Sequence, residues 1–99
     1  MALRTTRPFV TGCWLIQFQV ANGPANPRDW VGLYDAAAAD TAFIQWIYLN
    51  GTKTAPTSGL ANASLQFTAP ATPGTYDVRF FVNDGFTRIA RSLTVTVAP

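Results

Sequence analysis

The stretch PRDWVGLY, residues 27–34, decides the fold and opens the aromatic-rich middle of the chain. Val31 and Leu33 alternate in it with larger or smaller neighbours, and a period of two is typical of a half-buried β-strand. Two more aromatic stretches follow, FIQWIY at 43–48 and YDVRFF at 76–81. With 3 Trp, 3 Tyr and 7 Phe in 99 residues, the chain has more rings than one small core needs. Either the core is unusually aromatic, or some rings face solvent and bind a flat ligand.

The composition favours a single β-rich domain spanning residues 1–99. A hydrophobic fraction of 48% is enough to form a core, and chains of this length fold as one domain. Charged residues make up 12%, and the acids are all Asp. A net charge of +2 with scattered Arg argues against nucleic acid, and no apolar run approaches the ~20 residues that span a membrane. One cysteine, Cys13, and no His exclude an internal disulfide and the usual zinc sites.

Turn signals recur every 8 to 14 residues, which is the spacing of an antiparallel β-sandwich. The clearest are ANGPANP at 21–27, Asn50-Gly51, APATPG at 69–74 and NDG at 83–85. About seven strands are expected between them, at 4–10, 13–20, 30–35, 43–49, 63–68, 75–83 and 88–97.

Alternation along these strands predicts which side chains point into the core. The inward set includes Trp14, Ile16, Phe18, Val20, Tyr76, Val78, Phe80, Val82, Leu93, Val95 and Val97. Cys13 is expected to behave as a small buried hydrophobe. Arg79 and Phe81 are predicted to point outward, which would leave an aromatic ring on a polar face.

The alternation in the strand at 30–35 predicts a shallow shelf on the outer face of its sheet, between two aromatic rings. With Val31 and Leu33 inward, Trp30 and Tyr34 point outward on either side of Gly32.

The strand at 43–49 can be oriented in two ways. Burying Gln45 without a partner would cost about 1–3 kcal/mol, which favours Gln45 outward and Trp46 inward. Burying Trp46 and Tyr48, however, requires partners for an indole N–H and a phenol O–H. The alternation alone leaves both orientations open.

Catalysis is not expected from this sequence. It contains no His to act as a base, and five Asp on a small sandwich without cleft-forming insertions do not indicate a hydrolase. A calcium site is an alternative, with Asp29, Asp35, Asp40 and the carbonyls of residues 22–26 as hard oxygen ligands. The other interpretation is that these Asp residues cap turns and pair with Arg, for example Asp29 with Arg79 or Arg88.

A sugar-binding surface is the favoured interpretation of the aromatic residues. Sugars present flat C–H faces and a rim of hydroxyls, so proteins bind them with stacked rings and polar groups at the edges. The expected platform has Trp30, Tyr34 and Phe81 on one outer sheet face, with a linear glycan crossing all three. The full set of candidate carbohydrate-binding residues is Trp30, Tyr34, Gln45, Trp46, Tyr48, Arg79, Phe81 and Asn83; no catalytic residue, metal ligand or cofactor is assigned.

The motifs at 26–34, 46–51 and 74–81 resemble a family of bacterial Ig-like β-sandwich domains from secreted, often carbohydrate-active, proteins. Two of these motifs are also similar to eukaryotic SKICH domains and to the N-terminal sandwich of plant purple acid phosphatases. The resemblance spans residues 27–94. It implies an Ig-like antiparallel β-sandwich in a secreted, extracellular protein.

The function expected from the rings and the resemblance together is that of a non-catalytic carbohydrate-binding module. Its partners would be a plant cell-wall polysaccharide, a β-glucan such as cellulose, and a covalently linked glycoside hydrolase. The alternative is a structural Ig-like spacer or protein-docking domain without glycan affinity.

Overall fold

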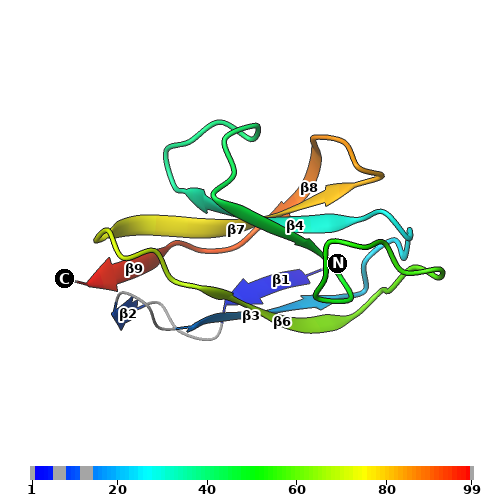
Figure 1. Cartoon of the computed structure of the whole chain (residues 1–99), viewed down its shortest axis with the longest axis horizontal. Coiled ribbons are helices and arrows are strands. Elements are labelled where there is room, and N and C mark those ends of the chain that lie inside the picture. Colours follow the sequence, from blue (N-terminus) through cyan, green and yellow to red (C-terminus); the bar gives the residue numbers. More distant parts are fainter. Residues whose placement is uncertain (1, 6–8, 12–14, 99) are drawn as a thin grey trace.

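The computed structural model describes residues 2–5, 9–11 and 15–98, and these residues form nine strands and no helix. The strands are β1 (Ala2–Thr5), β2 (Phe9–Thr11), β3 (Leu15–Ala21), β4 (Trp30–Asp35), β5 (Gln45–Tyr48), β6 (Ala63–Thr68), β7 (Gly74–Val82), β8 (Thr87–Arg91) and β9 (Val95–Ala98). They form two facing layers (Figure 1).

One layer is a three-stranded sheet in the order β1-β3-β6, and the other has the order β2-β9-β7-β4-β5. Strand β4 pairs along one edge of β7. Strands β8 and β9 share its other edge, where Arg79 pairs with Arg91 and Tyr76 with Val95. Among the described strands every pairing is antiparallel except that of β2 with β9. This all-β, Ig-like sandwich confirms the fold expected from the sequence.

Strands β4 and β6 have the bounds that the sequence predicts, and two predicted strands are divided. The segment 4–10 becomes β1 and β2, which belong to different sheets. The segment 88–97 is interrupted after Arg91, where the Ser92 amide donates to the Val78 carbonyl at 2.8 Å. The Ser92 hydroxyl accepts from the Val78 amide at 3.0 Å, so a side chain continues the ladder where the backbone departs from it.

The inner core lies between the two sheets and is made mostly of alternate strand residues. Its buried members are Ile16, Phe18, Val20, Val31, Leu33, Leu49, Phe67, Ala69, Tyr76, Val78, Phe80, Val95 and Val97. The inward set predicted for β3, β7 and β9 is thereby largely confirmed, with Val82 only partly buried. Trp14 and Cys13 lie outside the described residues. Leu93 was wrongly expected to be inward: it is 86% exposed, because the interruption at Ser92 resets the alternation before β9.

A second buried group, the outer cluster, covers the opposite face of the larger sheet. It consists of Trp30, Tyr34, Tyr48 and Phe81. The sequence places three of these rings on that face correctly, but the expectation that they are exposed is wrong. Trp30 is 5% exposed, and Tyr34 and Phe81 are fully buried.

No shelf forms over Gly32. A Cβ there would lie 2.7 Å from Tyr34 Cε1 and 3.1 Å from Trp30 Cζ3, so the two rings close over the glycine. Only a residue without a side chain fits beneath them.

Candidate ligand-binding site

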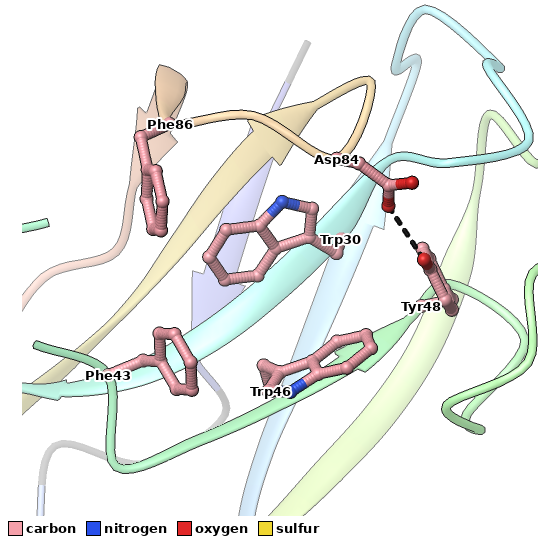
Figure 2. Close-up of a pocket in the computed structure, with 6 residues that line it drawn as sticks. All are labelled: Trp30, Phe43, Trp46, Tyr48, Asp84 and Phe86. Carbon is pink, nitrogen blue, oxygen red and sulfur yellow. Dashed lines mark hydrogen bonds between the residues drawn. The ribbon is translucent and has the colours of Figure 1, made fainter. Parts of the chain in front are cut away.

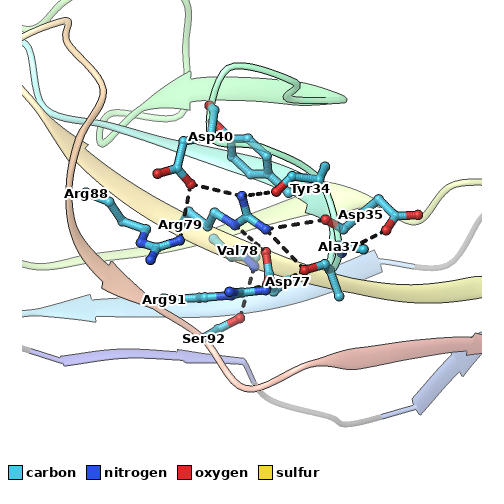
Figure 3. Close-up of polar contacts among 12 residues, drawn as sticks. Tyr34, Asp35, Ala37, Asp40, Asp77, Val78, Arg79, Arg88, Arg91 and Ser92 are labelled. Carbon is cyan, nitrogen blue, oxygen red and sulfur yellow. Dashed lines mark hydrogen bonds and ion pairs between the residues drawn. The ribbon is translucent and has the colours of Figure 1, made fainter.

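Arg79, expected at the edge of a sugar-binding surface, is instead a buried anchor for the loop that follows β4. Its side chain is 2% exposed, and its guanidinium lies 4.4 Å from the centre of the Tyr34 ring. All five of its N–H groups donate hydrogen bonds (Figure 3). Nε donates to Asp77 at 2.9 Å, and Nη1 donates to Asp40 at 2.9 Å and to the Ala38 carbonyl at 2.8 Å. Nη2 donates to the carbonyls of Asp35 and Ala36, both at 3.4 Å. Arg79 therefore holds residues 35–40 against the outer face of the sheet.

Acidic partners compensate the charge buried with Arg79. Asp77 is fully buried and accepts from Arg79 and Arg91, one on each carboxylate oxygen. Asp40 accepts from Arg79 at 2.9 Å and from Arg88 at 3.2 Å. A buried charge is tolerated only when it is paired and hydrogen-bonded, and this network meets both conditions.

The Tyr34 ring is fixed by the same loop. Its hydroxyl donates to the Asp40 carbonyl at 2.5 Å. Burial, and after it the nearby Asp40 carboxylate, raise the pKa of Tyr34 to about 12. Tyr34 is therefore a neutral structural ring beneath the loop, unavailable for stacking on a ligand.

Asp29 pairs with neither Arg79 nor Arg88, the two partners that the sequence suggested. It is 1% exposed, and its two oxygens accept from the backbone amides of Asn26 at 3.1 Å and Asn83 at 3.2 Å. These bonds join the loop before β4 to the turn after β7. The structure does not bring Asp29, Asp35 and Asp40 together as calcium ligands, and within the described ranges no three acidic, Cys or His side chains form a group that could hold a metal.

The segment between β7 and β8 places the side chains of Asp84 and Phe86 near Trp30. Asn83 and Asp84 have φ angles of 54° and 58°, and the Gly85 amide donates to the Val82 carbonyl at 3.0 Å. Positive φ at both central residues is the signature of a type I′ turn. The Trp30 indole donates to the Gly85 carbonyl at 3.0 Å, which fixes the turn beside the ring.

These elements enclose a shallow cavity of about 280 Å³, which we call the aromatic cup. Its lining residues are Trp30, Phe43, Trp46, Tyr48, Asp84 and Phe86 (Figure 2). They come from β4, the loop before β5, β5 itself, the β7–β8 turn and the residue before β8. Segments far apart in the sequence thus converge on one hollow.

Trp30 lies at the centre of the aromatic cup, and three rings stand nearly perpendicular to it. Phe81 stacks on Trp30 at 4.4 Å with an angle of 20° between the planes. The walls are Phe86 at 5.6 Å and 87°, Phe43 at 5.9 Å and 75°, and Trp46 at 6.2 Å and 76°. Because Trp30 is almost fully covered, the surface offered to a ligand belongs mainly to the walls.

One corner of the aromatic cup is polar. The Tyr48 hydroxyl donates to Asp84 at 2.6 Å, and Arg28 pairs with the second Asp84 oxygen at 2.9 Å. The hydrogen bond from Tyr48, and after it the one from Arg28, lower the pKa of Asp84. The bond between Tyr48 and Asp84 also raises the pKa of Tyr48. Asp84 therefore remains a carboxylate near neutral pH and keeps lone pairs for further donors.

Six of the eight predicted site residues divide into two groups. Trp30, Trp46 and Tyr48 line the aromatic cup, whereas Tyr34, Arg79 and Phe81 are buried behind it.

The two other predicted site residues also lie outside the aromatic cup's lining. Gln45 is only partly buried, and its amide donates to the Thr68 carbonyl at 2.9 Å. This bond resolves the orientation of β5, with Trp46 on the outer face and Ile47 against the inner core. The inward orientation of Trp46, which the cost of burying Gln45 favours, is therefore wrong, because the Thr68 carbonyl is a partner for the Gln45 amide that the sequence does not reveal. Asn83 is an exposed residue of the turn.

Sequence reasoning missed Phe43, Asp84 and Phe86. A signal for each was present: Phe43 begins the FIQWIY stretch, and the other two flank Gly85 in the NDG turn. Turn tips and strand entries carry binding residues more often than strand interiors.

Comparison of the chain with protein-family models, with curated proteins and with solved structures finds no match. In the part of the chain that the structure describes, no helix is long and apolar enough to cross a membrane.

Proposed function

We propose that this domain is a non-catalytic carbohydrate-binding module that holds sugar in the aromatic cup. The observation that carries the proposal is the convergence of three partly exposed rings on one cavity. Phe43 is 40% and Phe86 48% exposed, and Trp46 is partly exposed beside them. Exposed rings around a hollow are costly to leave in water and are suited to the C–H faces of a sugar.

The polar corner supports the same ligand class. A sugar that stacks on the walls brings its hydroxyls to Asp84, whose carboxylate is a strong acceptor for O–H donors. Among the described residues that line the cavity, Asp84 is the one carboxylate. Glycoside hydrolysis ordinarily uses two carboxylates, so the lining supports binding without catalysis.

The biological setting belongs to the proposal and rests on the sequence resemblance. The ligand would be a plant cell-wall β-glucan, the parent protein would be secreted, and the module would target a covalently linked glycoside hydrolase. The buried Trp30, Tyr34 and Phe81 cannot form the flat platform that the sequence suggested, so the binding surface moves to the walls of the aromatic cup.

Affinity gel electrophoresis across soluble polysaccharides tests the proposal. We expect a β-glucan to retard the wild-type protein and Trp46→Ala to abolish the retardation. Leu93→Ala is the matched control, because Leu93 is an exposed apolar side chain outside the lining. Thermal unfolding of each variant shows that it is folded. Retardation by no polysaccharide would contradict the proposal.

A protein-docking domain is the second candidate. Ile44 is 46% exposed and follows the exposed Phe43 in the sequence, so two exposed apolar residues are consecutive there. Contiguous exposed apolar residues mark protein interfaces. In that case no glycan would change the Trp fluorescence, while Ile44→Asp would weaken a protein partner's binding.

A further inference from the structure

The outer face of the three-stranded sheet carries polar side chains that are paired across two strands. Gln17 and Gln19 on β3 and Ser64 and Gln66 on β6 are all exposed. Gln17 lies opposite Gln66 and Gln19 opposite Ser64, so two polar pairs follow each other about 7 Å apart along the strands. Among the described residues, none of these four side chains has a hydrogen-bond partner in the protein, so their donors and acceptors face water.

Two open hollows run together along this row. The first, of about 320 Å³, is lined by all four side chains. The second, of about 400 Å³, shares Gln19 and Ser64 with the first and extends the row to Asn62. We call the combined surface, formed by Gln17, Gln19, Asn62, Ser64 and Gln66, the amide groove.

The chemistry of the amide groove favours an uncharged ligand rich in hydroxyls. Among the described residues that line it there is no Asp, Glu, Lys or Arg. It also lacks an outward ring, because Phe18 points into the inner core and is 1% exposed. Side-chain amides both donate and accept, as hydroxyls do. Protein interfaces instead concentrate aromatic residues, Met and Arg at their centre, so a protein partner fits this surface less well than a glycan chain.

We propose that the amide groove is a second sugar-binding surface, which holds a neutral glycan chain through hydrogen bonds to its hydroxyls. It lies on the outer face of the smaller sheet, and the aromatic cup lies on the outer face of the larger one, so both layers of the sandwich separate the two sites (Figure 1). The inference goes beyond the proposed function, because neither site needs the other in order to bind. Without ring stacking, the amide groove binds more weakly than the aromatic cup and too weakly to retard the protein in a gel.

NMR titration of the protein with a linear β-gluco-hexasaccharide tests the inference. The side-chain amide signals of Gln17, Gln19 and Gln66 report on the amide groove, and the Trp46 indole signal reports on the aromatic cup. We expect both sets of signals to shift, with a dissociation constant from the Gln signals at least about tenfold larger than that from Trp46.

A substitution in the amide groove provides a second measurement. Gln66→Ala should raise the dissociation constant from the remaining Gln signals about two- to tenfold, as expected for the loss of one hydrogen bond, and leave the Trp46 titration unchanged. Thr68→Ala is the matched control and should change neither, because Thr68 is exposed on the same face of β6 but does not line the groove.

The two sets of signals separate the possible outcomes. A shift of the Trp46 signal alone would overturn the inference and leave the proposed function intact. A shift of the Gln signals alone would support the inference and contradict the proposed function, and both fail if neither set shifts. Gln signals that move with protein concentration in the absence of sugar would show that a second copy of this chain occupies the groove, which would also overturn the inference.

Discussion

The larger sheet has two buried faces that are stabilised in different ways. The inner face packs aliphatic and Phe side chains against the second sheet and involves few side-chain hydrogen bonds. Among the described strands, none forms a second sheet above the outer face. Its aromatic rings are covered by the loop at 36–44 and by the β7–β8 turn, which Arg79, Tyr34 and Trp30 hold in place through hydrogen bonds.

The difference shows how one small domain accommodates so many aromatic residues. An antiparallel sheet ordinarily leaves one face to solvent, but here loops bury it and require a polar network to do so. Where the cover ends, the rings of Phe43, Trp46 and Phe86 remain partly exposed and form the aromatic cup. Packing accounts for the inner face, and anchored loops account for the outer face and its cavity.

The largest expected effect comes from truncating the inner face. Phe80 is fully buried, and Phe80→Ala should lower the free energy of unfolding by about 3–5 kcal/mol, because it removes packing and leaves a cavity. Phe86→Ala, at the half-exposed rim, should cost much less. Urea denaturation of both variants measures the contrast, and equal losses would remove the distinction between core and rim.

The second effect tests whether charge anchors the outer cover. Arg79→Ala should cost about 3 kcal/mol, because it leaves buried carbonyls without their donor, while Arg91 still pairs with Asp77 and Arg88 with Asp40. Arg88→Ala removes an exposed contact to the same Asp40 and should cost less than about 1 kcal/mol. The same denaturation assay applies. A loss for Arg79→Ala no greater than that for Arg88→Ala would show that the loop needs no anchor.

The third effect is a loss of stability at alkaline pH that comes from Tyr34 in the outer cluster. Because the pKa of Tyr34 is raised to about 12 in the folded protein, its stabilising contribution is complete below its ordinary pKa of about 10 and is lost as the pH rises towards 12. Stability should therefore fall in that range, and Tyr34→Phe should reduce the fall. Denaturation at a series of pH values measures it; identical profiles for the two proteins would show that Tyr34 does not titrate as proposed.

The smallest effect concerns the polar corner of the aromatic cup. The pKa of Asp84 is lowered, so its contribution is present above about pH 4, the ordinary value for Asp, and is lost as the pH falls through the folded value. Asp84→Asn should slightly lower the thermal midpoint at neutral pH. The variant and the wild type should converge in acid. A constant difference at all pH values would mean that the carboxylate charge is not what stabilises the turn.

The strands were predictable because local sequence determines them. Alternation and turn residues gave the bounds of β4 and β6 and the inward residues of β3 and β7. The interruption at Ser92 was not predictable, because it depends on a hydroxyl reaching across to Val78. The alternation of apolar and polar residues does not indicate where a side chain replaces a backbone hydrogen bond between strands.

The site was predictable only in part, because its burial is decided by residues distant in sequence. Alternation placed Trp30, Tyr34 and Phe81 on one face, but nothing near them indicated that a loop would cover them. That cover depends on Arg79 reaching carbonyls about forty residues away. The walls were missed because Phe43 and Phe86 lie just outside strands, where alternation gives no orientation.

The parallel pairing of β2 with β9 has a mechanical consequence. Among the described strands β2 follows only β1, which pairs in the other sheet, and β9 is the last. Strands β2 and β9 join through Phe9 with Thr96, Val10 with Val97 and Thr11 with Ala98. A force that separates the two ends pulls parallel neighbours in opposite directions along their length. Their ladder bonds are then loaded in shear and must break together, not one by one. In single-molecule pulling, Val10→Pro, which removes a backbone donor, should lower the rupture force; an unchanged force would place the mechanical resistance elsewhere.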